Sequence, residues 1–89
     1  MNMKFGIGVV IAIVLQVSAY DTQRHDMLDA VEHYATGNIA IHKMNVEVYL
    51  SNPAGIGEHS DVTEAVVAEM EKIARWQDVV DTINEHFRK

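Results

Sequence analysis

The sequence predicts an all-α fold: a hydrophobic N-terminal helix followed by an antiparallel helical hairpin. Three observations lead to this prediction. An uncharged apolar run fills residues 5–20, two apolar stripes with helical spacing fill residues 21–50 and 62–89, and a cluster of helix breakers separates the stripes. The chain therefore divides into a hydrophobic segment (1–20), a first amphipathic helix (21–50), a connector (51–61) and a second amphipathic helix (62–89).

The N-terminal run allows three interpretations. Sixteen residues cover roughly 24 Å as a helix, whereas about 20 apolar residues are typical of a membrane span. A membrane anchor is therefore short, a secretory signal peptide would be cleaved after Ala19, and a buried helix would lie inside a protein assembly. In the first and third cases the residues that contact lipid or protein are Phe5, Ile7, Val10, Ile13 and Val14.

The first amphipathic segment follows a heptad pattern that is typical of helix packing. Met27, Tyr34, Ile41 and Val48 form one row, with Val31, Asn38 and Asn45 on the adjacent row. Asn at such positions fixes the register or oligomeric state of a coiled coil. Alternation over residues 44–50 also fits a strand, but the chain offers no second strand to pair with it.

The second amphipathic segment gives the clearest helical signal, because neither Gly nor Pro interrupts it. Val66, Ile73, Val80 and Phe87 recur every seven residues, with Met70 on the adjacent row. We predict an interface between the two helices formed by Val31, Tyr34, Asn38, Ile41, Val48, Val66, Met70, Ile73, Val80 and Phe87.

The connector contains Pro53, Gly55 and Gly57, which we predict to form the turn. Proline removes a backbone N–H and restricts the residue before it, while glycine permits positive φ. The chain should therefore reverse here, and Ser60 or Asp61 is placed to cap the following helix.

One stretch resembles a known group of proteins. Residues 42–50, HKMNVEVYL, and 52–59, NPAGIGEH, followed by Asp61 and Val62, resemble a small uncharacterised protein of tailed cyanophages, the viruses of marine cyanobacteria. The resemblance covers residues 39–73 and the hydrophobic N-terminus. It implies a viral origin and a role in the virion or the host envelope, and it provides no catalytic residues to transfer.

Composition and motifs favour a non-enzymatic protein. The net charge of −6 argues against nucleic-acid binding, and the absence of cysteine excludes disulfides and thiolate metal sites. His25, Asp29 and His33 share a helical face but match no metal motif. The run Glu58–Asp61 brings together acid, imidazole and hydroxyl groups, although a helix cap explains it better than catalysis does.

Taken as a whole, the pattern predicts a membrane-tethered or virion-associated helical structural protein that forms a homo-oligomer or joins a larger assembly. No cofactor, metal, nucleic acid or small-molecule substrate is expected. The alternative is a secreted or periplasmic helical binding module released by cleavage after Ala19, which N-terminal sequencing would identify.

The turn prediction can be tested by replacing Gly55 and Gly57 together with Val. If these glycines hold positive φ, each replacement costs about 1–3 kcal/mol of backbone strain, and the melting temperature should fall. Thermal unfolding of the variant beside the parent measures the change. An unchanged melting temperature would contradict a glycine-dependent turn.

Overall fold

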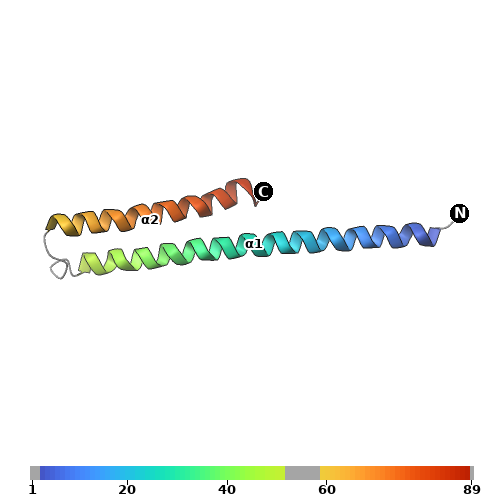
Figure 1. The fold of residues 1–89 in the computed structure, drawn as a ribbon, viewed down its shortest axis with the longest axis horizontal. Coiled ribbons are helices and arrows are strands. Elements are labelled where there is room, and N and C mark those ends of the chain that lie inside the picture. The colour runs from blue at the N-terminus through green and yellow to red at the C-terminus, as the bar shows by residue number, and fades with distance from the viewer. Residues whose placement is uncertain (1–2, 52–58, 89) are drawn as a thin grey trace. The chain divides into compact units, whose positions relative to one another are not determined.

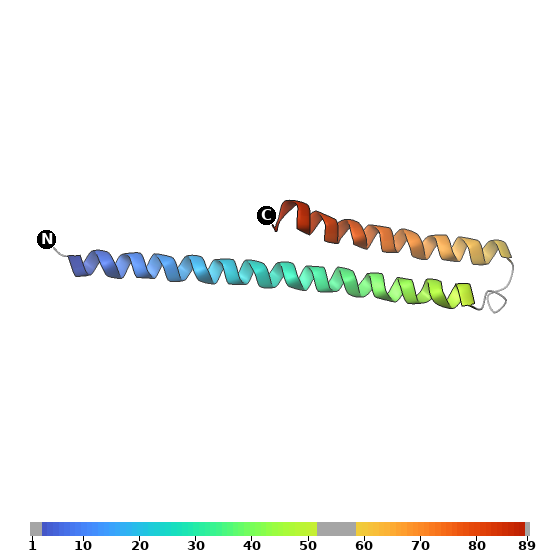
Figure 2. The same ribbon diagram turned by 180° about the vertical axis from the view of Figure 1, so that it is seen from behind.

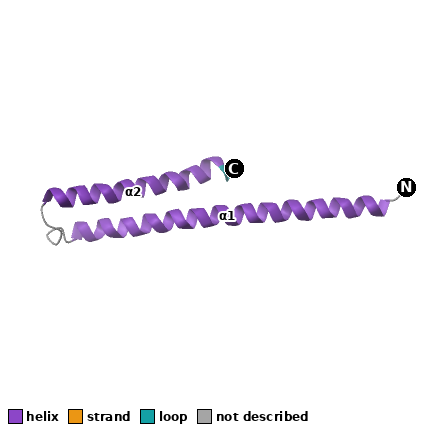
Figure 3. Ribbon diagram, in the orientation of Figure 1, coloured by secondary structure: helices purple, strands orange, loops and turns teal. Residues whose placement is uncertain are grey.

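The computed structural model describes residues 3–51 and 59–88 and contains two helices. Helix α1 spans Met3–Ser51 and helix α2 spans His59–His86 (Figure 1). The described parts of the chain contain no strand, as the colouring in Figure 3 shows. The prediction of an all-helical fold is therefore confirmed, including for residues 44–50, whose alternation also fits a strand.

Helix α1 includes both the apolar N-terminal run and the first amphipathic segment. No break in the helix marks the expected boundary near residue 20. The helix ends at Ser51, where the Ser51 hydroxyl donates to the Val48 carbonyl oxygen at 3.1 Å. Because Pro53 disfavours helical geometry at the residue before it, an end at this point agrees with the sequence. The predicted turn residues Pro53, Gly55 and Gly57 lie outside the described residues.

Helix α2 begins at His59, three residues before the expected start at residue 62. Asp61 lies in its first turn, where a carboxylate interacts favourably with the positive end of the helix dipole. At the other end, the backbone N–H groups of Phe87 and Arg88 both donate to the Ile83 carbonyl oxygen, at 2.9 and 3.1 Å. These bonds satisfy a carbonyl group that the helix itself would leave without a partner.

The chain divides into two units, Met1–Ala30 and Val31–Lys89. In the first unit Val14 and Tyr20 are exposed, and the predicted contact residues Phe5, Ile7, Val10 and Ile13 have side chains outside the description. Within the residues that the structure describes, no helix is both long enough and apolar enough to cross a membrane.

In the second unit the C-terminal part of α1 packs beside α2 in antiparallel orientation (Figures 1 and 2). Glu32 pairs with Arg88 and His42 pairs with Glu69. Residue numbers that increase along α1 therefore pair with residue numbers that decrease along α2, as in an antiparallel arrangement. These contacts support the predicted hairpin.

Gly37 provides a test of helix stability in α1. A Cβ atom added at this position would meet no atom within 4 Å, so alanine fits without displacing a neighbour. Gly37→Ala should raise the free energy of unfolding by about 0.5–1 kcal/mol, because glycine is a poor helix former. Urea unfolding measures the gain, with the exposed Ala40→Gly as the reverse control. A variant less stable than the parent would contradict the open space around Gly37.

Candidate functional site

The side chains through which α1 and α2 contact each other follow a heptad spacing. We call this contact the hairpin seam. Its side chains are buried or half-buried and recur every three or four residues, as expected when two helices pack along their length. On α1 they are Glu32, Ala35, Ile39, His42, Val46 and Tyr49, and on α2 they are Val62, Val66, Glu69, Ile73, Trp76, Val80 and Ile83.

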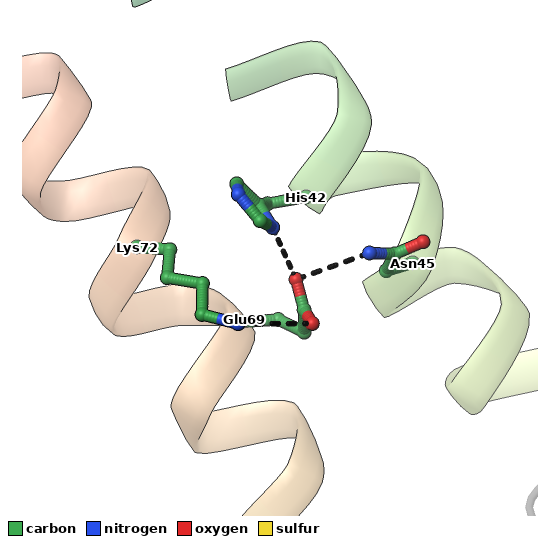
Figure 4. Close-up of polar contacts among 4 residues, drawn as sticks. All are labelled: His42, Asn45, Glu69 and Lys72. Atoms are coloured by element: carbon green, nitrogen blue, oxygen red, sulfur yellow. Dashed lines mark hydrogen bonds and ion pairs between the residues drawn. The ribbon is translucent and has the colours of Figure 1, made fainter. Parts of the chain in front are cut away.

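A polar cluster interrupts the apolar part of this seam around the buried Glu69 carboxylate. His42 Nδ1 lies 2.5 Å from Glu69 Oε2, and Asn45 Nδ2 donates to the same oxygen at 3.3 Å (Figure 4). Lys72 Nζ lies 3.8 Å from the other oxygen, Oε1. An ionised carboxylate only accepts hydrogen bonds, so His42 presents its Nδ1–H to Glu69. One acidic side chain of α2 is therefore held by two side chains of α1.

The environment of Glu69 favours its charged form. The hydrogen bond from His42 is the main reason that the pKa of the Glu69 carboxyl lies below its ordinary value of 4.5. Desolvation acts in the opposite direction, while the Asn45 hydrogen bond and the positive charge of Lys72 lower the pKa further. The cluster therefore stabilises a carboxylate at a position where isolated burial would be unfavourable.

Two further contacts lie on one side of the cluster, towards the C-terminal end of α2. The rings of Tyr34 and Trp76 meet edge to face, with centroids 5.2 Å apart and planes at 86°. Near the end of α2, Arg88 Nη2 donates to Glu32 Oε2 at 3.1 Å. Edge-to-face ring pairs and half-buried ion pairs each fix one relative placement of two elements. The seam is thus held at three points along its length.

The predicted interface residues fall into two groups in the structure. Asn38, Val66, Ile73 and Val80 are half-buried, and the last three belong to the hairpin seam. Six others are exposed in the single chain: Val31, Tyr34, Ile41, Val48, Met70 and Phe87. On α1 the seam passes through the row Ala35, His42 and Tyr49, which is one residue further along than the predicted row Tyr34, Ile41 and Val48. One residue is a rotation of about 100° around a helix.

Sequence reasoning missed the pairing of Glu69 with His42. The available signal was Glu69 itself, which occupies a position in the repeat Val62, Val66, Glu69, Ile73, Trp76 where an apolar residue is expected. A charged residue in such a position requires a partner. His42 occupies the equivalent place in the α1 row.

The other candidate groups have little structural support. No cluster of three or more His, Asp or Glu side chains suited to a metal ion occurs within residues 3–51 and 59–88, and this includes His25, Asp29 and His33. Of the run Glu58–Asp61, Glu58 and the side chains of His59 and Ser60 lie outside the described residues. Two surface hollows in the first unit lie on α1 between Ser18 and Ala30 and are open to solvent.

Comparisons with family models, curated proteins and solved structures find no match to this chain.

The polar cluster predicts an acid-dependent loss of stability. Because the pKa of Glu69 is lower in the folded chain than in the unfolded one, its stabilising effect is present above pH 4.5 and is lost as the pH falls through the lower folded value. Glu69→Gln should therefore lower the melting temperature at pH 7, and the difference from the parent should shrink towards pH 3.

Thermal unfolding of both proteins at several pH values measures this difference. Glu71→Gln is the matched control, since Glu71 is exposed on the same helix. A difference between parent and Glu69→Gln that stays constant from pH 7 to pH 3 would contradict the role of the ionised carboxylate.

Proposed function

We propose that this chain is a non-enzymatic helical interaction protein whose hairpin unit is completed by self-association or by docking on a larger assembly. The observation that carries the proposal is the imbalance between buried and exposed apolar side chains. Among the described residues the buried hydrophobic side chains are Ala35, Val46 and Ile83. The large apolar side chains that remain exposed are Val14, Tyr20, Met27, Val31, Tyr34, Ile41, Met44, Val48, Leu50, Val67, Met70 and Phe87.

This imbalance matters because helices in proteins gain most of their stability from packing an apolar face. Fixing the backbone costs about 1–2 kcal/mol per residue, and burial of a Val or Ile side chain returns only about 1.5–3 kcal/mol. A seam with so few buried apolar residues leaves the hairpin marginal by itself. Contiguous exposed apolar residues are typical of surfaces that bind other proteins.

In this proposal the N-terminal half of α1 determines where in the virion or host envelope the protein is held. The apolar run with Phe5, Ile7, Val10, Ile13 and Val14 would contact either a host membrane or the interior of a virion. The resemblance of residues 39–73 to a cyanophage protein supports a viral setting for both alternatives. The hairpin unit would then present its exposed apolar side chains to partner subunits.

Sedimentation velocity of the full-length chain over a hundredfold range of concentration tests self-association. We expect the weight-average mass to rise with concentration, both with and without a mild non-ionic detergent. The measurement in detergent is needed because detergent suppresses any association that occurs through the N-terminal run alone. A helical monomer throughout the range, which binds no larger particle, would contradict the proposal.

A further inference from the structure

Helix α1 carries a second heptad repeat beside the hairpin seam, within residues 31–48. We call it the outer seam and define it by Val31, Tyr34, Asn38, Ile41, Asn45 and Val48, which are spaced alternately three and four residues apart. Its row Tyr34, Ile41 and Val48 precedes the seam row Ala35, His42 and Tyr49 by one residue, or about 100° around the helix. A helix in a four-helix bundle contacts two neighbours at about this separation.

Four of the six outer-seam residues are exposed in the single chain, although the Tyr34 ring also meets Trp76 edge to face, and Asn38 and Asn45 are half-buried. The exposed fractions of Val31, Tyr34, Ile41 and Val48 are 45%, 64%, 52% and 56%. From these residues we propose that a second copy of this chain docks on the outer seam, so that the two α1 helices form a parallel, in-register pair related by a two-fold axis. This inference rests on the proposed function and names the partner.

Asn38 and Asn45 favour a second copy over an unrelated partner and favour the parallel orientation. In the heptad of the outer seam, position a holds Val31, Asn38 and Asn45, and position d holds Tyr34, Ile41 and Val48. A parallel two-fold pair places each of these residues opposite its own equivalent. An amide is complementary to another amide, because it offers both N–H donors and a carbonyl acceptor. In an antiparallel pair, Asn would instead face apolar d residues and lose this partner.

The hydrogen bonds within the chain leave both amides able to pair in this way. Asn38 Nδ2 donates to the Tyr34 carbonyl oxygen at 2.8 Å, and Asn45 Nδ2 donates to Glu69 at 3.3 Å. Each NH₂ group has a second hydrogen and each amide has a carbonyl oxygen. Both amides can therefore keep their present bond while they pair across the two-fold axis.

The charge pattern also permits two copies to meet. No Asp, Glu, Lys or Arg occurs at the a, d or flanking g positions of this stretch, and the g positions are Ala30, Gly37 and Met44. The charged residues nearby, Glu32, Lys43 and Glu47, occupy other positions of the repeat. The net charge of −6 is therefore kept away from the proposed contact, where like charges would repel.

Single cysteines can test the proposal directly, because the chain contains none. We expect Tyr34→Cys and Val48→Cys, each alone in the full-length chain, to form disulfide-linked homodimers under mild oxidation. A parallel two-fold pair brings each cysteine near its own equivalent, within the ~4.4–6.8 Å between Cα atoms that a disulfide requires. Lys43→Cys, exposed at a different position of the repeat, is the matched control.

Both variants should cross-link at least ten times faster than Lys43→Cys. If they cross-link no faster than the control, the proposal is overturned. It is also overturned if a mixture of the two variants yields only the mixed disulfide, because an antiparallel pair centred on Ile41 would separate equivalent Val48 Cα atoms by roughly 20 Å. In either case a parent chain that still associates in sedimentation leaves the proposed function standing, and only the assignment of the surface fails.

A second pair of variants tests the surface without cysteine. Ile41→Glu places a charge in the outer seam, whereas Ala40→Glu adds the same charge at an exposed position outside both seams. We expect Ile41→Glu to weaken self-association at least tenfold and Ala40→Glu to change it less than twofold, while circular dichroism shows equal helix content. Equal effects on association from the two variants would overturn the proposal.

Discussion

The Glu69 carboxylate lies in the hairpin seam where the repeat of α2 otherwise places apolar side chains, and its two hydrogen-bond partners come from the other helix. An ion placed there without partners would be strongly unfavourable. The observed register brings His42 and Asn45 opposite Glu69 and supplies these hydrogen bonds. A slide of one helical turn would move these partners by about 5.4 Å, beyond hydrogen-bonding distance. The cluster therefore selects one alignment from the several that an apolar stripe alone would permit.

This choice of register has consequences along the whole seam. With Glu69 fixed opposite His42, the antiparallel arrangement places Tyr34 against Trp76 and Glu32 against Arg88. Each of these contacts uses a side chain with a directional preference, so a shifted alignment would lose all three together. Apolar contacts add to the stability of the seam, but residues such as Val46 and Ile83 would tolerate more than one alignment. Specificity and stability thus come from different residues.

The sequence was sufficient to predict the helices but not the buried face of α1. In α2 most large apolar residues share one stripe, so the sequence assigns Val66, Ile73 and Val80 to the seam, whereas Val67, Met70 and Phe87 are exposed. In α1 apolar residues surround much of the helix, and the spacing of Tyr34, Ile41 and Val48 is as regular as that of Ala35, His42 and Tyr49. Periodicity cannot rank two such rows, because it records spacing and not contact. The choice depends on Glu69, whose need for partners is visible only when both helices are considered together.

Asn45 links the two seams of α1, and this has a consequence for assembly. Its amide donates to Glu69 in the hairpin and also occupies an a position of the outer seam. In the proposed pair, an Asn45 side chain already held by Glu69 would lose less rotational freedom on meeting its equivalent, and preorganisation of this kind favours binding. The Asn38 amide donates to the Tyr34 carbonyl oxygen of its own helix, and this bond does not link α1 to α2. Hairpin formation and self-association would therefore be coupled through one side chain, with the folded hairpin as the form that associates.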